Sequence, residues 1–218
     1  MTDLVIFDCD GVLVDSEVPA NRLLSRYLND HGIPLTPEQT QATFVGLSLS
    51  SCAALARERF GVTLPDDFIP EIRRMTAEVL AREVTAIAGV EAAVAALQCA
   101  SCVASSGEIE KMQLTLGRTG LLPLFQGRLY SATMVERGKP APDLFLFAAA
   151  QMNTDPATCV VVEDSPFGLQ AAKAAGMRAI GFTGGGHRDL DRDRALLTDA
   201  GADVVIDRMT DLVALLDR

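Results

Sequence analysis

The segment 16–87 separates the first apolar run of this chain from all the later ones, and this interruption constrains the fold more than any other feature. The first run, Leu4–Phe7, has the short, continuous apolar pattern of a buried parallel strand. The segment that follows is rich in Ala, Leu, Arg and Glu, and its prolines divide it into about four predicted helices. A structureless loop of this length is improbable in a compact domain. We therefore predict that residues 16–87 form a second, helical domain inserted after the first strand.

Strands and helices alternate regularly after this insertion. Apolar runs predict strands at 101–105, 159–162, 178–182 and 203–206, and helical patterns lie at 108–119, 142–151 and 166–176. The last of these helices has Ser165 as its N-cap and stops at Gly176. The alternation predicts an α/β fold in which helices cover both faces of a parallel sheet. The expected domains are a discontinuous core, 1–15 and 88–218, and the inserted helical domain, 16–87.

Charge and composition restrict the partners of the chain. Lys and Arg number 19 against 29 Asp and Glu, so the net charge is −10, which argues against nucleic acid and anionic membranes. A small phosphorylated substrate stays compatible, because it needs only a local cluster of positive charge. No apolar run approaches the ~20 residues of a membrane span, the N-terminus has no basic signal region, and five irregularly spaced cysteines do not form a disulfide framework. We expect a cytoplasmic monomer.

Carboxylates follow two of the predicted strands. Asp8 and Asp10 come directly after the first strand, and Glu163 and Asp164 end the strand at 159–162. Ligands of an open parallel sheet bind beyond the carboxyl ends of its strands, and carboxylates buried together there need a cation or a shared proton. No thiolate or imidazole cluster suggests zinc, so oxygen ligands favour Mg²⁺. An acidic turn or helix cap is the alternative for Asp8 and Asp10 taken alone.

A hydroxyl and an ammonium group are expected at the same edge of the sheet. Ser105 ends the strand at 101–105, and Lys139 lies in a Gly-Lys-Pro sequence just before the helix at 142–151. Together with the carboxylates they predict a site for a cation and a phosphate group. Ser106 is the alternative hydroxyl, although the strand register favours Ser105.

Four motifs of the chain resemble those of the haloacid dehalogenase-like phosphohydrolase superfamily. They are the run FDCDGVLVDSE at 7–17, Ser105, Lys139 within GKPAPD, and VEDSPFG at 162–168. Their order and their places at strand ends agree over essentially the whole chain. The resemblance is to subfamily I, within the beta-phosphoglucomutase-like group and its 6-phosphogluconate phosphatase-like members, to which 83–112 is particularly similar. It implies a Rossmann-like parallel-sheet core with an all-helical cap domain inserted at 16–87.

The resemblance implies a phosphatase mechanism that also makes physical sense. Asp8 is the expected nucleophile, which forms an aspartyl-phosphate and needs no separate base because a carboxylate is ionised at neutral pH. Asp10 is the expected general acid, and then the base that activates water. Ser105 and Lys139 are expected to bind the phosphoryl oxygens.

The same resemblance implies a set of metal ligands. Mg²⁺ is expected on the carboxylate of Asp8, the main-chain carbonyl of Asp10 and the carboxylate of Asp164, with Glu163 reaching it through water. The ion would lower the repulsion between an anionic nucleophile and an anionic phosphate. The expected substrate is a small phosphorylated metabolite of the sugar or sugar-acid phosphate class.

Other activities of related proteins remain as alternatives. A phosphosugar mutase of the beta-phosphoglucomutase type usually carries a histidine where this chain has Ala20 beside Asn21, which favours hydrolysis. A phosphonatase needs a lysine in the cap, and residues 16–87 contain none. A non-catalytic phosphate-sensing module would not need to retain Asp10.

Substrate specificity is expected in the cap, which would close over the site. Gly46 and Ser48 form the candidate cap loop, in which the glycine permits a close backbone approach. Arg22 and Lys111 are candidate contacts for the distal part of the substrate, and Ser106 is a further candidate. The alternatives are that Arg22 is an ordinary helix-surface residue and that Lys111 pairs with Glu108.

Overall fold

The computed structural model describes residues 2–44, 47–186 and 190–216 of the chain. The chain divides into two compact units, one comprising Met1–Asp15 and Thr85–Arg218 and the other Ser16–Val84. Thr85–Ala86 and Ile87, assigned to the insertion from the sequence, belong to the first unit. The reason is local pairing, because Thr85 and Ala86 form a strand pair with residues 14–15 and the Ile87 N–H donates to the Leu13 carbonyl.

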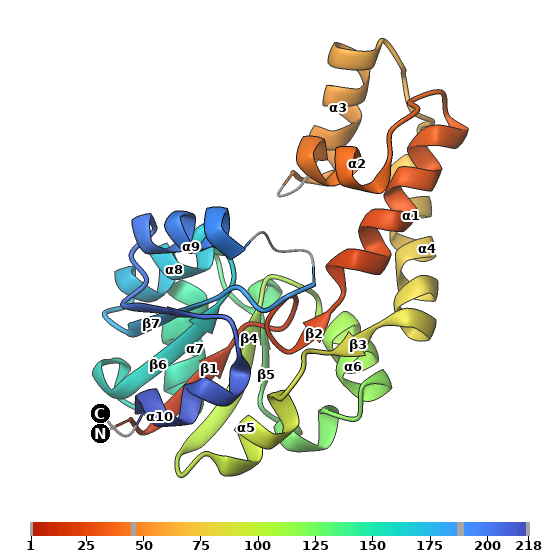
Figure 1. Cartoon of the computed structure of the whole chain (residues 1–218). Coiled ribbons are helices and arrows are strands. Elements are labelled where there is room, and N and C mark those ends of the chain that lie inside the picture. Colours follow the sequence, from red (N-terminus) through yellow and green to blue (C-terminus); the bar gives the residue numbers. More distant parts are fainter. Residues whose placement is uncertain (1, 45–46, 187–189, 217–218) are drawn as a thin grey trace. The chain divides into compact units, whose positions relative to one another are not determined.

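A six-stranded sheet forms the centre of the first unit, and all of its neighbouring strands run parallel (Figure 1). The order across the sheet is β5 (Leu129–Ser131), β4 (Ala100–Ser105), β1 (Leu4–Phe7), β6 (Cys159–Glu163), β7 (Arg178–Phe182) and β8 (Val204–Ile206). The α/β parallel-sheet fold predicted from the sequence is therefore confirmed. β1 is fully buried between β4 and β6, as its continuous apolar run indicates.

Helices cover both faces of this sheet (Figure 1). Leu4 and Ile6 of β1 join the apolar cluster beneath one group of helices, whereas Phe7 packs edge-on against Phe125 on the other face. The first group is α7 (Asp143–Gln151), α8 (Pro166–Ala174) and α9 (Leu190–Asp199); the second is α5 (Val90–Ala96), α6 (Ile109–Arg118) and α10 (Leu212–Leu216). Short 3₁₀ turns are η1 (Leu122–Phe125), η2 (Ala132–Met134), η3 (Pro156–Thr158) and η4 (Met209–Asp211).

Two features of the first unit were not predicted. The edge strand β5 has the sequence Leu-Tyr-Ser, which is not an apolar run, whereas the equally short β8 (Val-Val-Ile) is continuously apolar and was predicted. A two-stranded antiparallel ribbon, β2 (Val14–Asp15) with β3 (Thr85–Ala86), lies at the two points where the chain leaves and re-enters the unit. Both features depend on pairing with residues distant in sequence, which local periodicity does not report.

Helices are the only regular secondary structure among the described residues of the second unit. It consists of α1 (Glu17–Asp30), α2 (Pro37–Phe44), α3 (Leu49–Phe60) and α4 (Phe68–Glu83). Leu28, Ile33 and Ala56 are completely buried in its separate apolar cluster. Gly61 ends α3 at φ 69°, a left-handed conformation that glycine adopts at little cost. Among the helices described in the two units, none is long and apolar enough to cross a membrane.

Candidate active site

The C-terminal end of β1 delivers Asp8 to the edge of the sheet. The Asp8 N–H donates to the Val162 carbonyl at 2.9 Å, so the residue continues the ladder between β1 and β6. The chain then turns at Gly11, whose φ of 77° is left-handed, and the Leu13 and Val14 N–H groups donate to the Cys9 carbonyl. This closed turn fixes the two aspartates of the first motif at the tip of the strand.

Lys139 connects the ends of three strands. Its Nζ donates to Asp8 Oδ1 at 2.7 Å, to Glu163 Oε1 at 2.6 Å and to the Ala104 carbonyl at 3.1 Å. Its side chain is only 4% exposed. Burial by itself lowers the pKa of Lys139, but the carboxylates of Asp8 and Glu163 outweigh it and raise the pKa above the usual range. Lys139 therefore remains an ammonium ion inside the site.

Carboxylates outnumber the ammonium group around Asp8. One oxygen from each of Asp8, Glu163 and Asp164 lies within 4.8 Å of the others, and all three residues are buried. Burial raises the pKa of Asp8 well above its usual range; Lys139 opposes this shift, and the neighbouring carboxylates add to it. A cluster of hard oxygen donors with excess negative charge fits Mg²⁺ in both ligand type and electrostatics.

Glu163 also holds the beginning of α8. Its Oε2 accepts hydrogen bonds from the N–H and the hydroxyl of Ser165, both at 2.9 Å. The Ser165 hydroxyl oxygen in turn accepts from the Gly168 N–H at 3.1 Å, which confirms the predicted N-cap. The carboxylate of Glu163 thus lies between Lys139 and the first turn of α8, directly against Gly168.

Replacing Gly168 with Ala is expected to destabilise the protein. Alanine within a helix is normally more stable than glycine by about 1 kcal/mol, but a Cβ at this position would overlap the Glu163 carboxyl group. We expect a net loss of about 1–3 kcal/mol in the free energy of unfolding, measured by urea denaturation.

Gly117→Ala is the matched control, since Gly117 is an exposed glycine within α6 whose added Cβ would meet only Leu122 at 3.8 Å. This variant should gain about 0.5–1 kcal/mol. Equal stabilisation by both substitutions would contradict the tight packing of Glu163 against Gly168.

The two serines after β4 have different environments. Ser105 is buried, and its Oγ accepts a hydrogen bond from the Gly107 N–H at 3.1 Å, whereas Ser106 is exposed. Ser131, at the end of β5, donates from its hydroxyl to the Gly107 carbonyl at 2.8 Å. Sequence analysis missed Ser131 because the Leu-Tyr-Ser sequence of β5 is not an apolar run, and no other local signal identifies this serine.

Lys111 lies at the first motif. Its Nζ donates to Asp10 Oδ2 at 2.8 Å, so Lys111 contacts a predicted catalytic group. Lys111 is 101 positions from Asp10 in sequence, and only the packing of α6 beside the end of β1 brings the two together. The first unit thus collects the predicted residues Asp8, Asp10, Ser105, Ser106, Lys111, Lys139, Glu163 and Asp164.

The candidates from the inserted segment belong to the second unit. Arg22 on α1 forms an exposed ion pair with Glu83 of α4 at 2.8 Å. Ser48 is the N-cap of α3, where its hydroxyl oxygen accepts from the Ser51 N–H at 3.1 Å. Gly46 lies outside the described residues. Both contacts lie within the helical unit, and the roles of Arg22 and Ser48 in substrate binding stay predictions.

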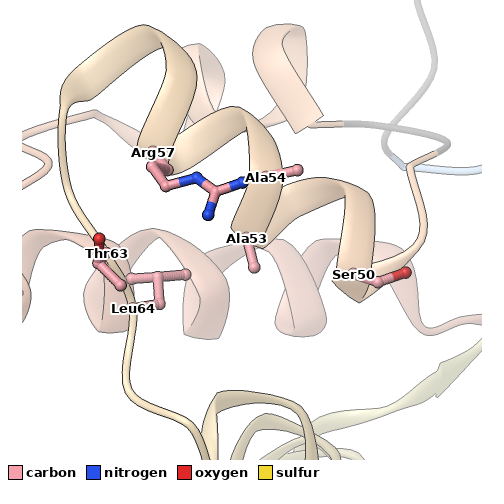
Figure 2. Close-up of a pocket in the computed structure, with 6 residues that line it drawn as sticks. All are labelled: Ser50, Ala53, Ala54, Arg57, Thr63 and Leu64. Atoms are coloured by element: carbon pink, nitrogen blue, oxygen red, sulfur yellow. The ribbon is translucent and has the colours of Figure 1, made fainter.

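The second unit also has a cavity of about 270 Å³ against α3 (Figure 2). Its lining residues are Ser50, Ala53, Ala54, Arg57, Thr63 and Leu64. None of the six was predicted as a site residue. The lining contains one charged side chain, Arg57, and no carboxylate, so it offers none of the acid groups that the edge of the sheet provides.

Comparisons with known proteins agree with this geometry. A family model described as haloacid dehalogenase-like hydrolase matches residues 5–182. The chain is 35% identical over 186 residues to a 6-phosphogluconate phosphatase of Escherichia coli (strain K12), and the match covers 85% of this chain and 84% of the relative.

Two solved structures share the whole fold. A conserved haloacid dehalogenase-like protein from Agrobacterium tumefaciens str. C58 has a TM-score of 0.92 and 39% identity, covering 100% of this chain and 98% of that one. A HAD family hydrolase from Deinococcus radiodurans R1, solved with bound phosphate and sodium, has a TM-score of 0.87 and 32% identity, covering 99% and 95%.

Proposed function

The chain belongs to the haloacid dehalogenase-like hydrolase family and is an enzyme of its phosphatase group, and from this premise we propose that it is a Mg²⁺-dependent phosphatase of small phosphorylated metabolites. The observation that carries the proposal is the buried contact of Lys139 with Asp8 and Glu163 at the carboxyl edge of the sheet. The similarity to a 6-phosphogluconate phosphatase supports sugar or sugar-acid phosphates as the substrate class.

Asp8 is proposed as the nucleophile. One of its carboxylate oxygens attacks phosphorus, an acyl-phosphate P–O bond forms, and the ester P–O bond breaks with its electron pair on the leaving oxygen. Asp10 gives that oxygen a proton. Asp10 then takes a proton from the water that attacks the aspartyl-phosphate, and this second displacement releases inorganic phosphate and restores Asp8.

Lys139 and Ser105 are proposed to bind the transferring group. Lys139 carries the positive charge of the site on a side chain fixed by three hydrogen bonds, so it would stabilise phosphoryl oxygens without reorganisation. The buried hydroxyl of Ser105 can donate to a further phosphoryl oxygen.

The carboxylates of Asp8 and Asp164 and the carbonyl of Asp10 are proposed to hold Mg²⁺, with Glu163 acting through water. The closeness of the three buried acids supports this set. When bound, the ion supplies positive charge that keeps the carboxylates ionised and offsets the charge of the phosphate.

Removing divalent cations is expected to stop turnover. EDTA should lower kcat/KM by about 10³-fold, because the excess negative charge of the acid cluster would then face the anionic substrate uncompensated. Excess Mg²⁺ should restore the rate, and EDTA already saturated with Mg²⁺ is the control. Undiminished phosphate release in EDTA, with metal analysis confirming an apoprotein, would exclude the metal from the mechanism.

A phosphate-release screen over phosphorylated metabolites with Mg²⁺ tests the function as a whole. We expect turnover with sugar or sugar-acid phosphates, including 6-phosphogluconate. A phosphosugar mutase is the second candidate, favoured by the resemblance to the beta-phosphoglucomutase-like group and opposed by Ala20, where mutases usually carry histidine. A mutase would isomerise its sugar phosphate without releasing phosphate in proportion to turnover, and no turnover at all would contradict both.

A further inference from the structure

Lys111 makes a contact for which the mechanism above has no role. Its ammonium group donates to Asp10 Oδ2 at 2.8 Å, and the side chains of Lys111 and Asp10 are 37% and 20% exposed. A half-buried, charge-assisted hydrogen bond of this kind is stronger than a bond between neutral groups. It ties the general acid of the first motif to α6.

The backbone that leads into α6 is fixed on both sides of one residue. The Gly107 N–H donates to Ser105 Oγ at 3.1 Å, and the Gly107 carbonyl accepts from Ser131 Oγ at 2.8 Å. Because Ser105 and Ser131 are both buried at strand ends, the sheet itself determines where α6 begins. The position of Lys111, in the first turn of that helix, follows from this starting point.

A second contact fixes α6 against the first motif. Thr115 Oγ1 donates to the Lys111 carbonyl at 3.0 Å and lies 4.0 Å from the sulfur of Cys9, the residue between the two aspartates. Both Cys9 and Thr115 are buried. α6 is therefore held to the aspartate turn at its core side, independently of the ion pair at its solvent side.

The space around Gly107 shows how closely these groups meet. A Cβ built on Gly107 would lie 3.5 Å from Ser105 Oγ, 3.6 Å from Lys111 Cδ and 3.7 Å from Asp10 Oδ2. The proposed phosphate-binding hydroxyl, the lysine stem and the general-acid carboxylate thus surround one backbone position.

We propose that Lys111 is a positioning residue that holds the Asp10 carboxylate in the orientation required for proton transfer to the leaving oxygen. The proposal rests on the proposed phosphatase function. An aspartate side chain can rotate about two bonds, and small misplacements of a proton donor cost much of its catalytic effect. Lys111 acts through Asp10 and not through the phosphate, which Lys139 and Ser105 bind.

The test compares two esters that depend differently on the general acid. A sugar phosphate has an alkoxide leaving group that must be protonated, whereas p-nitrophenyl phosphate has one that leaves without a proton. kcat/KM includes all steps through departure of that group. Lys111→Met should lower kcat/KM by about 10- to 100-fold for the best sugar phosphate of the screen and by only a few-fold for p-nitrophenyl phosphate.

Three further variants separate positioning from other roles. In an Asp10→Asn background, Lys111→Met should cause no additional loss, because its effect passes through Asp10. Lys111→Arg should recover part of the rate, since it retains a cationic donor. Lys173→Met is the matched control, because Lys173 of α8 forms a comparable ion pair with Asp203 at 2.8 Å. This substitution should leave the rates with both esters unchanged.

Equal losses with the two esters, or additive losses in the double variant, would overturn the positioning role and indicate a substrate contact or a structural effect. Lys111→Gln repeats the comparison if the methionine variant does not fold, as judged by circular dichroism. Failure of the positioning role can be distinguished from failure of the proposed phosphatase function. If the function were wrong, the unmodified protein would release no phosphate.

Discussion

Asp8→Asn is expected to reduce phosphate release by about 10⁴-fold or more, because an amide cannot form the covalent intermediate on which both steps depend. The measurement is kcat for the best sugar phosphate in Mg²⁺, together with mass spectrometry of the acid-quenched protein. The unmodified protein should carry one phosphoryl group on Asp8 during turnover, and the variant should carry none.

The same variant should keep its fold, which makes the result specific to chemistry. Asparagine has nearly the shape of aspartate, and Lys139 retains Glu163 as a charged partner. The neutral amide also avoids the cost of burying a charge, which is the main cause of the raised pKa of Asp8, and the repulsion by the neighbouring carboxylates, which adds to it. An unchanged far-UV spectrum with lost turnover is the expected pair of results; turnover above about 1% of the original would show that another residue is the nucleophile.

Asp10→Asn is expected to slow two steps at once. Asparagine can neither protonate the leaving oxygen nor accept a proton from water, so we expect kcat to fall by about 10²- to 10⁴-fold. Single-turnover experiments should show slower release of the sugar and slower decay of the aspartyl-phosphate. The contact of Asp10 with Lys111 predicts that the variant remains folded, because asparagine keeps a carbonyl oxygen that can accept this hydrogen bond.

The two steps provide an internal control for Asp10. With p-nitrophenyl phosphate the first step needs no protonation, so only the hydrolysis of the intermediate should slow, and the aspartyl-phosphate should accumulate. A variant that turns over either ester at the unmodified rate would rule out acid–base catalysis by Asp10.

The fold class could be predicted from local pattern alone. The central strand β1 is a continuous apolar run, and β4, β6 and β7 are mainly apolar, because parallel strands in the middle of a sheet are buried on both faces. The edge strand β5 was missed because its Leu-Tyr-Ser sequence is not a continuous apolar run, in contrast to the equally short β8. Because β5 was not predicted, Ser131 at its end was missed as well, although it fixes Gly107 and the start of α6.

The glycine of α8 shows a signal that sequence analysis could have used more fully. An isolated glycine within a predicted helix usually has a packing reason. Gly168 belongs to the fourth motif, but the packing of the Glu163 carboxyl group against its backbone depends on a side-chain orientation that no local pattern contains.

The sequence alone determined which chemical groups would gather at the site. All parallel strands present their carboxyl ends at one edge of the sheet, and Asp8, Ser105 and Asp164 each terminate or follow such a strand. Pairings between side chains were decided only by folding. Lys139 and Asp8 are 131 positions apart and Lys111 and Asp10 are 101 apart. Whether such groups meet at hydrogen-bonding distance depends on strand register, helix placement and rotamer, which arise from packing across the sheet and not from neighbouring residues.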